Sequence, residues 1–357
     1  ETPNWEFLEK SIRFILNQYC YNEIRLPILE KTELFKHAIG GNTDIVSKEM
    51  YSFEDKNKSS LTLRPEGTAS CVRAGIEHGL FYNQIQRLWY MGPMFRYEKP
   101  QKGRQRQFHQ LGVEAFGLNG PDIDAEQIMI CDRIWKQLKI KNVNLQINSL
   151  GTSESRFNYK NILVDYFSSN RNDLDEDSLI RLEKNPLRIL DSKNPDMKSL
   201  INNAPNINEY LDIESADHFA ELRELLDHAN IKYNTNSKLV RGLDYYGKTV
   251  YEWTTRELGA QDTVCAGGRY DDLIKNHGSS PTPAIGFAIG IERLLELVDL
   301  ENVVAKNTPH VYLLIAGDEV KKFGLLLAEE VRNQLPYVKI LTNCGGGSLK
   351  NQFKKAD

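Results

Sequence analysis

Residues 92–117 read GPMFRYEKPQKGRQRQFHQLGVEAFG, two alternating segments joined by a basic loop. Because successive side chains of a strand point to opposite faces, Arg96 and Glu98 share one face of the first segment. Gln110 and Glu114 share one face of the second segment in the same way. If the segments pair, these four side chains line one floor, which suits a polar ligand. A solvated sheet face with an exposed charged loop is the alternative.

The loop between the two segments is basic, although the chain has a formal net charge of −4 at pH 7. Within eleven residues Glu98 is the only acid, and the bases there are Arg96, Lys99, Lys102, Arg104 and Arg106. The loop is longer than the ~2–5 residues of usual hairpin loops. Phe108 at its edge is an aromatic ring beside arginines, which suits a flat base stacked above phosphates. These features favour a nucleotide as the ligand.

The composition bounds the class of protein. A chain of 357 residues exceeds one compact core of usual size, which predicts two or three domains. Its content of 40% hydrophobic and 26% charged residues is typical of a soluble globular protein. No apolar run approaches the ~20 residues that cross a bilayer, and the N-terminal ETPNWEFLEK does not have the pattern of a signal peptide.

The cysteines indicate the compartment. They are far apart and form no CxxC pair, at Cys20, Cys71, Cys131, Cys265 and Cys344. This spacing argues against zinc and against a disulfide scaffold, and it favours a reducing compartment. We therefore expect a cytoplasmic protein without zinc.

The first half of the chain predicts a helix followed by an antiparallel sheet. Residues 5–19 have apolar side chains near helical spacing. RLPILEKTELF (25–35) contains Pro27, which suits an edge strand or the entry of a strand better than a central strand. Between residues 61 and 117 the apolar period changes to two, with strands expected at LTLRP, RLWYMGPMFRYE and FHQLGVEAFG. Neighbouring strands of this kind predict antiparallel pairing.

The second half predicts an insertion and a further unit. Residues 152–236 are polar and interrupted by prolines, and we interpret them as a mainly helical insertion. Strands are expected again at TVYEW (249–253) and AIGFAIG (284–290), with a helix directly after the latter. From residue 309 an apolar strand, a helix near 318–334 and the strand VKILTN predict the start of an α/β unit. The unit stops at roughly half the length of a usual domain.

Four further motifs each allow a plain structural reading. In RPEGT (64–68), Glu66 and Thr68 read as helix-start residues, and Thr68 could cap the following helix. Alternatively, the Glu66 carboxylate could hold a ligand's ammonium group. LVRGLDYY (239–246) alone reads best as a turn with polar surface residues. Arg293, in the helix after AIGFAIG, opposes the helix dipole unless Glu292 or a bound phosphate offsets it. CGGG (344–347) lacks the ending of a phosphate-binding loop and is expected to be a turn.

Taken in order, these segments resemble the histidyl-tRNA synthetase family of class II aminoacyl-tRNA synthetases. The stretch 92–117 is similar to the family's motif 2, AIGFAIGIERLLEL (284–297) to motif 3, and RLPILEKTELF to part of motif 1. RPEGT and LVRGLDYY are similar to segments specific to the histidine enzymes. The resemblance covers essentially the whole chain.

The resemblance implies an α+β fold with an antiparallel six-stranded sheet, flanking helices, a helical insertion and a C-terminal α/β anticodon-binding domain. We therefore expect a catalytic domain at residues 1–308, with the insertion at about 152–236. The start of the anticodon-binding domain is expected at 309–357, cut short in this sequence. A homodimer built partly on motif 1 is also implied. The family's usual N-terminal strand is not found in the sequence, which we ascribe to trimmed ends.

The resemblance also implies site residues. The catalytic residues would be Arg96, Arg241 and Arg293. ATP would be bound by Arg96, Glu98, Arg104, Phe108, Arg241 and Arg293. Histidine would be bound by Glu66, Gly67, Thr68, Gln110, Glu114, Tyr245, Tyr246 and Tyr270. Mg²⁺ is expected with the triphosphate, and its ligands are not assigned.

The activity implied is histidine–tRNA ligation: histidine is activated with ATP to histidyl-adenylate and pyrophosphate, and then passes to the 3′ end of its tRNA. Imidazole carries one donor and one acceptor, so a pocket that pairs with both rejects analogues by factors up to ~10⁴. One alternative is a non-catalytic, histidine-binding regulatory paralogue, which would be expected to lose some phosphate arginines and the anticodon domain. A class II synthetase for another amino acid is a second alternative, against which LVRGLDYY argues.

Overall fold

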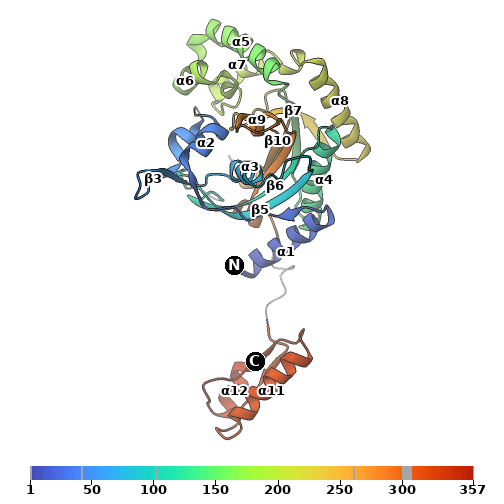
Figure 1. Ribbon diagram of the computed structural model, residues 1–357. Helices are drawn as coiled ribbons and strands as arrows, with labels where there is room; N and C mark the ends of the chain where they lie inside the picture. Colours follow the sequence, from blue (N-terminus) through green and yellow to red (C-terminus); the bar gives the residue numbers. More distant parts are fainter. Residues whose placement is uncertain (1, 42, 101–102, 260–261, 300–307, 357) are drawn as a thin grey trace. The chain divides into compact units, whose positions relative to one another are not determined.

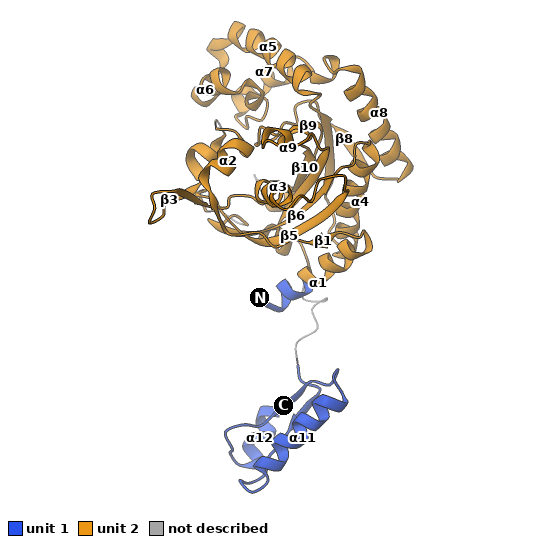
Figure 2. Cartoon of the chain, viewed as in Figure 1, with its two compact units in different colours: residues 1–7, 300–357 blue, residues 8–299 orange. Residues whose placement is uncertain are grey.

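The computed structural model describes residues 2–41, 43–100, 103–259, 262–299 and 308–356. The chain divides into two compact units, shown in Figures 1 and 2: residues 8–299, and residues 300–357 together with residues 1–7. In the described ranges we find no helix that combines the length and the apolar character needed to traverse a bilayer.

A large sheet forms the centre of the unit 8–299, in the order β1-β5-β6-β11-β10-β9-β7-β8. Its strands are β1 (Asn22–Glu23), β5 (Gln86–Phe95), β6 (Gln107–Phe116), β7 (Asn144–Ser149), β8 (Tyr233–Thr235), β9 (Gly247–Thr254), β10 (Thr263–Arg269) and β11 (Ala284–Gly290). The six inner strands of this order, β5-β6-β11-β10-β9-β7, all pair antiparallel with their neighbours. The short strands β1 and β8 extend this sheet at its two edges by parallel pairing, so the expected six strands are the inner part of an eight-stranded sheet.

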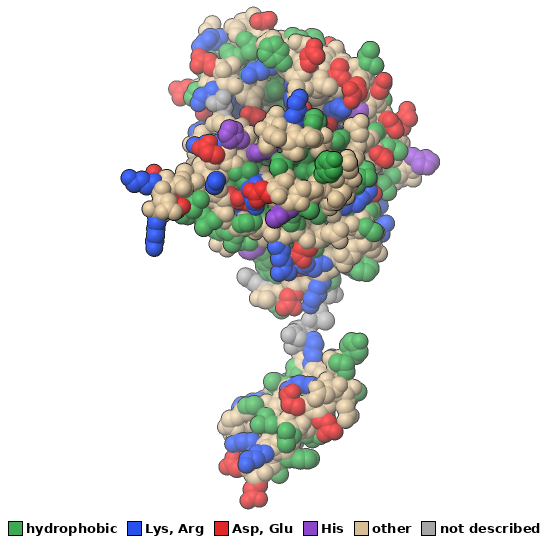
Figure 3. Space-filling view, viewed as in Figure 1, with side chains coloured by type: hydrophobic (Ala, Val, Ile, Leu, Met, Phe, Trp, Pro, Cys, Tyr) green, Lys and Arg blue, Asp and Glu red, His purple; other side chains and the backbone are tan. Residues whose placement is uncertain are grey.

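A second, three-stranded sheet has the order β2-β4-β3, with β2 (Leu29–Lys31), β3 (Tyr51–Glu54) and β4 (Ser60–Leu63). In RLPILEKTELF only residues 29–31 form a strand, which lies at an edge as Pro27 predicts, and a helix begins at Thr32. The reason is that Phe35, Ala38 and Ile39 are buried at helical spacing. Figure 3 shows basic side chains at the end of the β3–β4 hairpin, where the turn contains exposed Lys56 and Lys58.

Helices cover the sheet and form the insertion. The α-helices of residues 1–299 are α1 (Thr2–Gln18), α2 (Thr32–Ile39), α3 (Thr68–Glu77), α4 (Pro121–Gln137), α5 (Ser153–Ser169), α6 (Glu176–Lys184), α7 (Lys198–Asn202), α8 (Ile213–His228), α9 (Asp272–Asn276) and α10 (Ile291–Leu295). Shorter helical turns are η1 (Ile45–Glu49), η2 (Arg171–Asp173), η3 (Pro186–Ile189), η4 (Pro195–Met197), η5 (Ile207–Glu209) and η6 (Arg256–Leu258). The segment 152–236 is therefore mainly helical, as expected.

The two faces of the large sheet differ. Helix α4 packs against β10 and β11, and α8 packs against α4, β7 and β9, so these helices cover one face. Leu111 and Val113 alternate along β6 and so lie on one face of the sheet, and both are fully buried. Figure 1 shows α3 and α9 in front of the sheet, and α2 contacts both of them.

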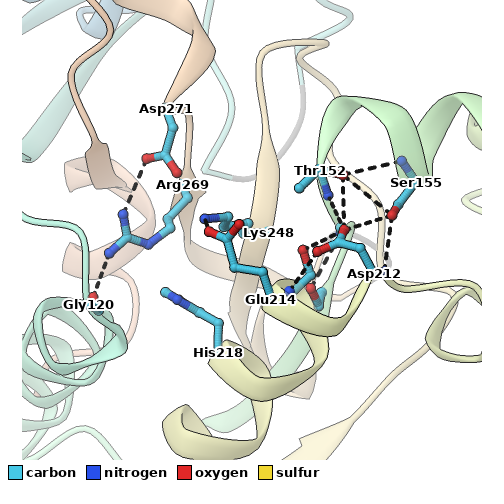
Figure 4. A network of polar contacts seen from close by, with 12 residues as sticks. Gly120, Thr152, Ser155, Asp212, Glu214, His218, Lys248, Arg269 and Asp271 are labelled. Atoms are coloured by element: carbon cyan, nitrogen blue, oxygen red, sulfur yellow. Dashed lines mark hydrogen bonds and ion pairs between the residues drawn. The ribbon is translucent and has the colours of Figure 1, made fainter.

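A buried ionic network ties helix α8 to the sheet, and Figure 4 shows two of its members, Arg269 and His218, together with the contacts of Arg269 to Asp271 and Gly120. Asp124 of α4 and Arg269 of β10 are both fully buried, with Arg269 Nε 2.8 Å from Asp124 Oδ1. His218 Nε2 of α8 lies 2.8 Å from Asp124 Oδ2. Burial opposes the charge of the Asp124 carboxyl, but Arg269 and His218 outweigh it and hold its pKa below the usual value. The insertion helix α8 is thereby fixed to the sheet that carries the site.

The C-terminal unit has the strand–helix–strand order expected from the sequence. Strands β12 (Val311–Leu313) and β13 (Ile340–Thr342) pair in parallel, α11 (Lys321–Gln334) connects them, and α12 (Leu349–Ala356) follows. The CGGG segment is an irregular connection between β13 and α12 with a bend at Gly345, and Gly345, Gly346 and Gly347 all have positive φ, a conformation that glycine adopts without strain.

Candidate active site

The main cavity has a volume of about 530 Å³ and contains the three arginines that the sequence singles out. Arg96, Arg241 and Arg293 are far apart along the chain, yet all three line it. The other expected residues that line it are Glu66, Thr68, Glu98, Arg104, Phe108, Gln110, Glu114, Tyr245, Tyr246 and Tyr270. Small residues contributed by β10 and β11, Ala266, Gly286 and Ala288, also line it, so a ligand can lie close to the sheet backbone.

Arg96 directly follows β5, at the start of the basic loop. Its Nε donates a 2.8 Å hydrogen bond to the carbonyl oxygen of Pro65, and its guanidinium carbon lies 5.3 Å from the ring centre of Phe108. Glu98 accepts a 2.8 Å hydrogen bond from Arg104 Nη1 and lies 3.8 Å from Arg96 Nη1. The loop therefore brings two cations, one carboxylate and one aromatic ring to the same wall of the cavity. Lys102 of the loop lies outside the described residues.

The contacts at the start of α10 differ from the sequence expectation. Glu292 does not act merely as a local counter-charge: its carboxylate accepts the backbone N–H of His109 at 2.9 Å and lies 3.0 Å from His109 Nδ1. It therefore fastens α10 to β6. Arg293 is buried, and its Nε donates to the carbonyl oxygen of Thr263 at 2.9 Å. Burial, and then the charge of Arg104, lower the pKa of the Arg293 guanidinium, and a bound anion would oppose both effects.

Arg241 precedes β9 and is largely buried, with 16% of its side chain exposed. Its Nη1 forms an ion pair with Glu252 of β9. Burial works against its charge, but Glu252 raises the pKa of the guanidinium, so Arg241 remains a cation. Its guanidinium carbon lies 5.5 Å from the ring centre of Tyr246.

A buried carboxyl group, that of Glu114, occupies the polar end of the cavity. Three hydroxyl groups donate to it: Thr68 Oγ1 at 2.8 Å, Tyr90 Oη at 3.0 Å and Tyr270 Oη at 2.5 Å. Glu114 is 1% exposed, and this burial raises its pKa to about 8 despite the three donors. The ring of Tyr245 lies 5.5 Å from that of Tyr270. A proton-bearing carboxyl among aromatic walls suits a flat polar group that can exchange a proton.

The RPEGT segment begins helix α3, as expected, but the capping residue differs from the expected one. Thr68 is the first residue of α3 and does not cap it. Glu66 takes this role, because its carboxylate accepts the backbone N–H groups of Thr68 at 2.7 Å and Ala69 at 2.9 Å. Gly67 does not line the cavity. A Cβ atom at Gly67 would overlap the ring of Tyr90, so this glycine makes room for a side chain that contacts Glu114.

Sequence reasoning missed several residues of the cavity. Glu252, Asp191, Lys193 and Asp262 line it, with Lys193 Nζ 3.8 Å from Asp262 Oδ1. Tyr90 contacts Glu114 from β5 without lining the cavity. Tyr90 has no sequence signal, because an aromatic residue in an alternating strand reads as core. Glu252 could have been found, since it is the single acid within the strand TVYEW.

Comparison with known proteins assigns the family. The sequence model described as histidyl-tRNA synthetase matches residues 1–294. The chain belongs to the histidyl-tRNA synthetase family. A crystal structure of apo histidyl-tRNA synthetase from S. aureus shares 33% sequence identity with it, with a TM-score of 0.82, over 100% of this chain and 85% of that one. The expected α+β fold of class II synthetases is confirmed by this likeness.

More distant family structures share the fold. The histidyl-tRNA synthetase from Nostoc sp. PCC 7120 has 19% identity and a TM-score of 0.68, over 99% of this chain and 86% of that one. A protein from Bacillus halodurans C, described as an ATP phosphoribosyltransferase regulatory subunit/histidyl-tRNA synthetase, has 20% identity and a TM-score of 0.69, over 99% and 92%. The fold is thus common to proteins with either description, and the residues of the site must distinguish them.

Proposed function

We propose that the protein is a histidine–tRNA ligase. A histidine carboxylate oxygen attacks the α-phosphorus of ATP, the bond to pyrophosphate breaks, and histidyl-adenylate forms. A ribose hydroxyl at the 3′ end of the tRNA then attacks the carbonyl carbon, and AMP leaves. The observation that carries the proposal is the convergence of Arg96, Arg241 and Arg293 on one cavity that also contains the buried Glu114.

Phosphate chemistry of this kind depends on positioning and on neutralising charge. We assign Arg96 to the α-phosphate and the attacking carboxylate, and Arg241 to the α-phosphate from another side. Arg293, together with Arg104, would bind the outer phosphates. Phe108 would stack on the adenine, with Arg96 close to its ring, and Glu98 would accept from the adenine amino group.

Histidine would be bound at the end of the cavity that contains Glu114. The imidazole would pair with Glu114 and with the hydroxyl groups of Tyr245 and Tyr246, with Tyr270 holding the carboxyl group in place. The ammonium group would lie near Glu66, Thr68 and Gln110, which share the cavity. Because the polar groups of such a pocket are buried, a ligand that leaves them unpaired is rejected.

Magnesium enters the reaction with the nucleotide. Across the described positions no cluster of three or more His, Cys, Asp or Glu side chains could hold a metal ion. Mg²⁺ commonly binds substrate phosphates and keeps several waters. We therefore treat it as part of the ATP substrate, where it neutralises charge on the phosphate oxygens.

The remaining partners follow from the family. We propose that residues 1–308 are the catalytic domain with a helical insertion at about 152–236, and that residues 309–357 belong to an anticodon-binding domain. The tRNA for histidine would contact the basic loop at 99–106 through phosphate groups, which gives affinity without sequence information. We also propose a homodimer and a cytoplasmic location.

A regulatory, histidine-binding role is the second candidate, favoured by the fold shared with the Bacillus halodurans C protein. The cavity supports the enzyme instead, because a protein that only binds histidine does not need three buried or half-buried arginines beside the histidine pocket. An isolated buried cation is costly unless it has a partner.

ATP–pyrophosphate exchange with each of the twenty amino acids tests the proposal. We expect exchange with histidine alone, and a loss of about 10²–10³-fold in Arg241→Ala, because charge stabilisation of this kind is worth several kcal/mol. Histidine affinity, measured by calorimetry, should change little in that variant. Histidine binding without any exchange would identify the regulatory protein, and normal exchange in Arg241→Ala would remove this residue from the mechanism.

A further inference from the structure

Arg241 is held by a different kind of contact from the other two arginines of the cavity. Arg96 Nε and Arg293 Nε donate to backbone carbonyl oxygens, at 2.8 and 2.9 Å. Arg241 instead pairs through Nη1 with the side chain of Glu252. A carboxylate in contact with a cation that acts on phosphate needs an explanation, because it offsets part of the charge that the phosphate requires.

Glu252 is itself held firmly. It lies in β9, opposite Ala266 of β10 and Gln146 of β7, so strands on both sides fix its backbone. Its second carboxylate oxygen, Oε2, accepts a hydrogen bond from Thr263 Oγ1 at 3.3 Å. The side chain is 17% exposed. Both oxygens of Glu252 are therefore engaged, one by Arg241 and one by Thr263.

Thr263 connects two of the arginines. Its hydroxyl donates to Glu252, which holds Arg241, and its carbonyl oxygen accepts from Arg293 Nε. As the first residue of β10, it is placed by the sheet and not by a free loop end. Arg241 and Arg293 thus share one anchor at the edge of the cavity.

Arg241 keeps one donor unused in the described structure. Its Nε is buried and has no hydrogen-bond partner among the described residues. Leaving a buried donor unsatisfied costs about 1–3 kcal/mol, and a purely structural arginine would normally pair it. Because Arg241 lines the cavity, this donor suits an acceptor supplied by the ligand.

We propose that Glu252 is the positioning residue of Arg241. It binds one nitrogen of the guanidinium and fixes its orientation, and Thr263 fixes Glu252 in turn, so that Nε remains for a phosphate oxygen of the nucleotide. Glu252 touches no substrate and transfers no proton. The inference rests on the proposed ligase function and adds a residue that acts only through Arg241.

A double-mutant cycle on ATP–pyrophosphate exchange with histidine tests this role. A charge-assisted hydrogen bond supports a loss of about 10–100-fold in kcat for Glu252→Gln, with KM for histidine within about threefold of the wild type. In the Arg241→Ala background, the same substitution should change exchange by less than about threefold, because the residue through which it acts is gone. If the loss of exchange in the double variant equals the product of the losses in Glu252→Gln and Arg241→Ala, the two residues act independently and the proposal is overturned.

Two further variants separate positioning from general effects. Asp191→Asn removes a carboxylate that also lies near Arg241 and acts through its charge, but has no direct contact with it. Its loss should stay below about threefold, since an uncontacted charge is better screened. Equal losses in Asp191→Asn and Glu252→Gln would show that only net charge matters, and would also overturn the proposal.

Thr263→Val keeps the backbone carbonyl for Arg293 and removes the hydroxyl that holds Glu252. We expect a smaller fall in exchange, about 3–10-fold, which again disappears in the Arg241→Ala background. If circular dichroism shows that Glu252→Gln is not folded, Thr263→Val is the deciding variant. An ATP–pyrophosphate exchange rate equal to that of the wild type in Thr263→Val would then overturn the proposal. A wild-type protein without exchange would instead mean that the ligase function is wrong.

Discussion

The raised pKa of Glu114 leads to a quantitative prediction for histidine binding. Burial raises the pKa of this carboxyl group to about 8, although Tyr270, Thr68 and Tyr90 donate hydrogen bonds to it. When histidine is not bound, the Glu114 carboxyl group is therefore mainly protonated at pH 7. An imidazole that enters it can share this proton, so that one proton lies between carboxyl and ring and no charge is left unpaired.

The number of protons exchanged on binding follows from these pKa values. At pH 7, a group with a pKa of about 8 is about 90% protonated, and an imidazole with a pKa of about 6.5 is about 25% protonated. The free partners thus carry about 1.15 protons and the complex carries one, so binding should release only about 0.15 proton. A Glu114 with an ordinary pKa near 4.3 would require an uptake of about 0.75 proton. At pH 8 the raised pKa predicts an uptake of about 0.5 proton.

Calorimetric titration with histidine in two buffers of different ionisation enthalpy measures this number directly. Tyr270→Phe provides the matched variant, because it removes the 2.5 Å hydroxyl contact, which lowers the pKa of Glu114. Its loss should raise that pKa further and bring the uptake at pH 8 below the wild-type value. The titration of the histidine ammonium group is the same in both proteins and cancels in the comparison. An uptake near 0.75 proton at pH 7 would refute the reasoning.

Two other predictions concern stability and reactivity. Asp124→Asn should lower the free energy of unfolding by about 3–5 kcal/mol in urea titrations, because it removes the fully buried counter-charge of Arg269. Asp271→Asn, which changes a partly exposed carboxylate 3.2 Å from the same guanidinium, should cost less than about 1 kcal/mol; equal losses would contradict this account. A thiol reagent should label only the exposed Cys20 and Cys344 rapidly in the native protein, and all five thiols after denaturation, since burial raises the pKa of the Cys71 and Cys131 thiols. Rapid labelling of a third thiol, or of any thiol in the Cys20→Ser, Cys344→Ser double variant, would be the contrary result.

Much of the site could be read from local pattern. Alternation in residues 87–98 and 108–117 predicted β5 and β6, and it placed Gln110 and Glu114 on the face that lines the cavity. Helical spacing predicted α1, and Pro27 predicted an edge position or the entry of a strand. These signals are local, because a period of two or of 3.6 residues is imposed by the backbone itself.

Other features depended on contacts between segments that are distant in the sequence. RPEGT reads as a capped helix start, but the cap is Glu66, and Thr68 turns to Glu114, 46 residues away. Gly67 was expected at the ligand, and the structure adds that its lack of a side chain makes room for Tyr90. The sequence around RPEGT does not indicate that Glu114 and Tyr90 are its neighbours, and these contacts decide the roles of Thr68 and Gly67.

The sequence by itself determined the order of the elements, because strand and helix periods are properties of contiguous residues. It indicated the class of fold and which arginines to follow through motifs that resemble those of a known family. Only the tertiary structure decided that Arg241 pairs with Glu252, that Thr263 serves both Arg241 and Arg293, and that Glu114 lies in surroundings that keep its proton. Burial and counter-charges set those properties, and both come from side chains that the fold brings together from separate strands.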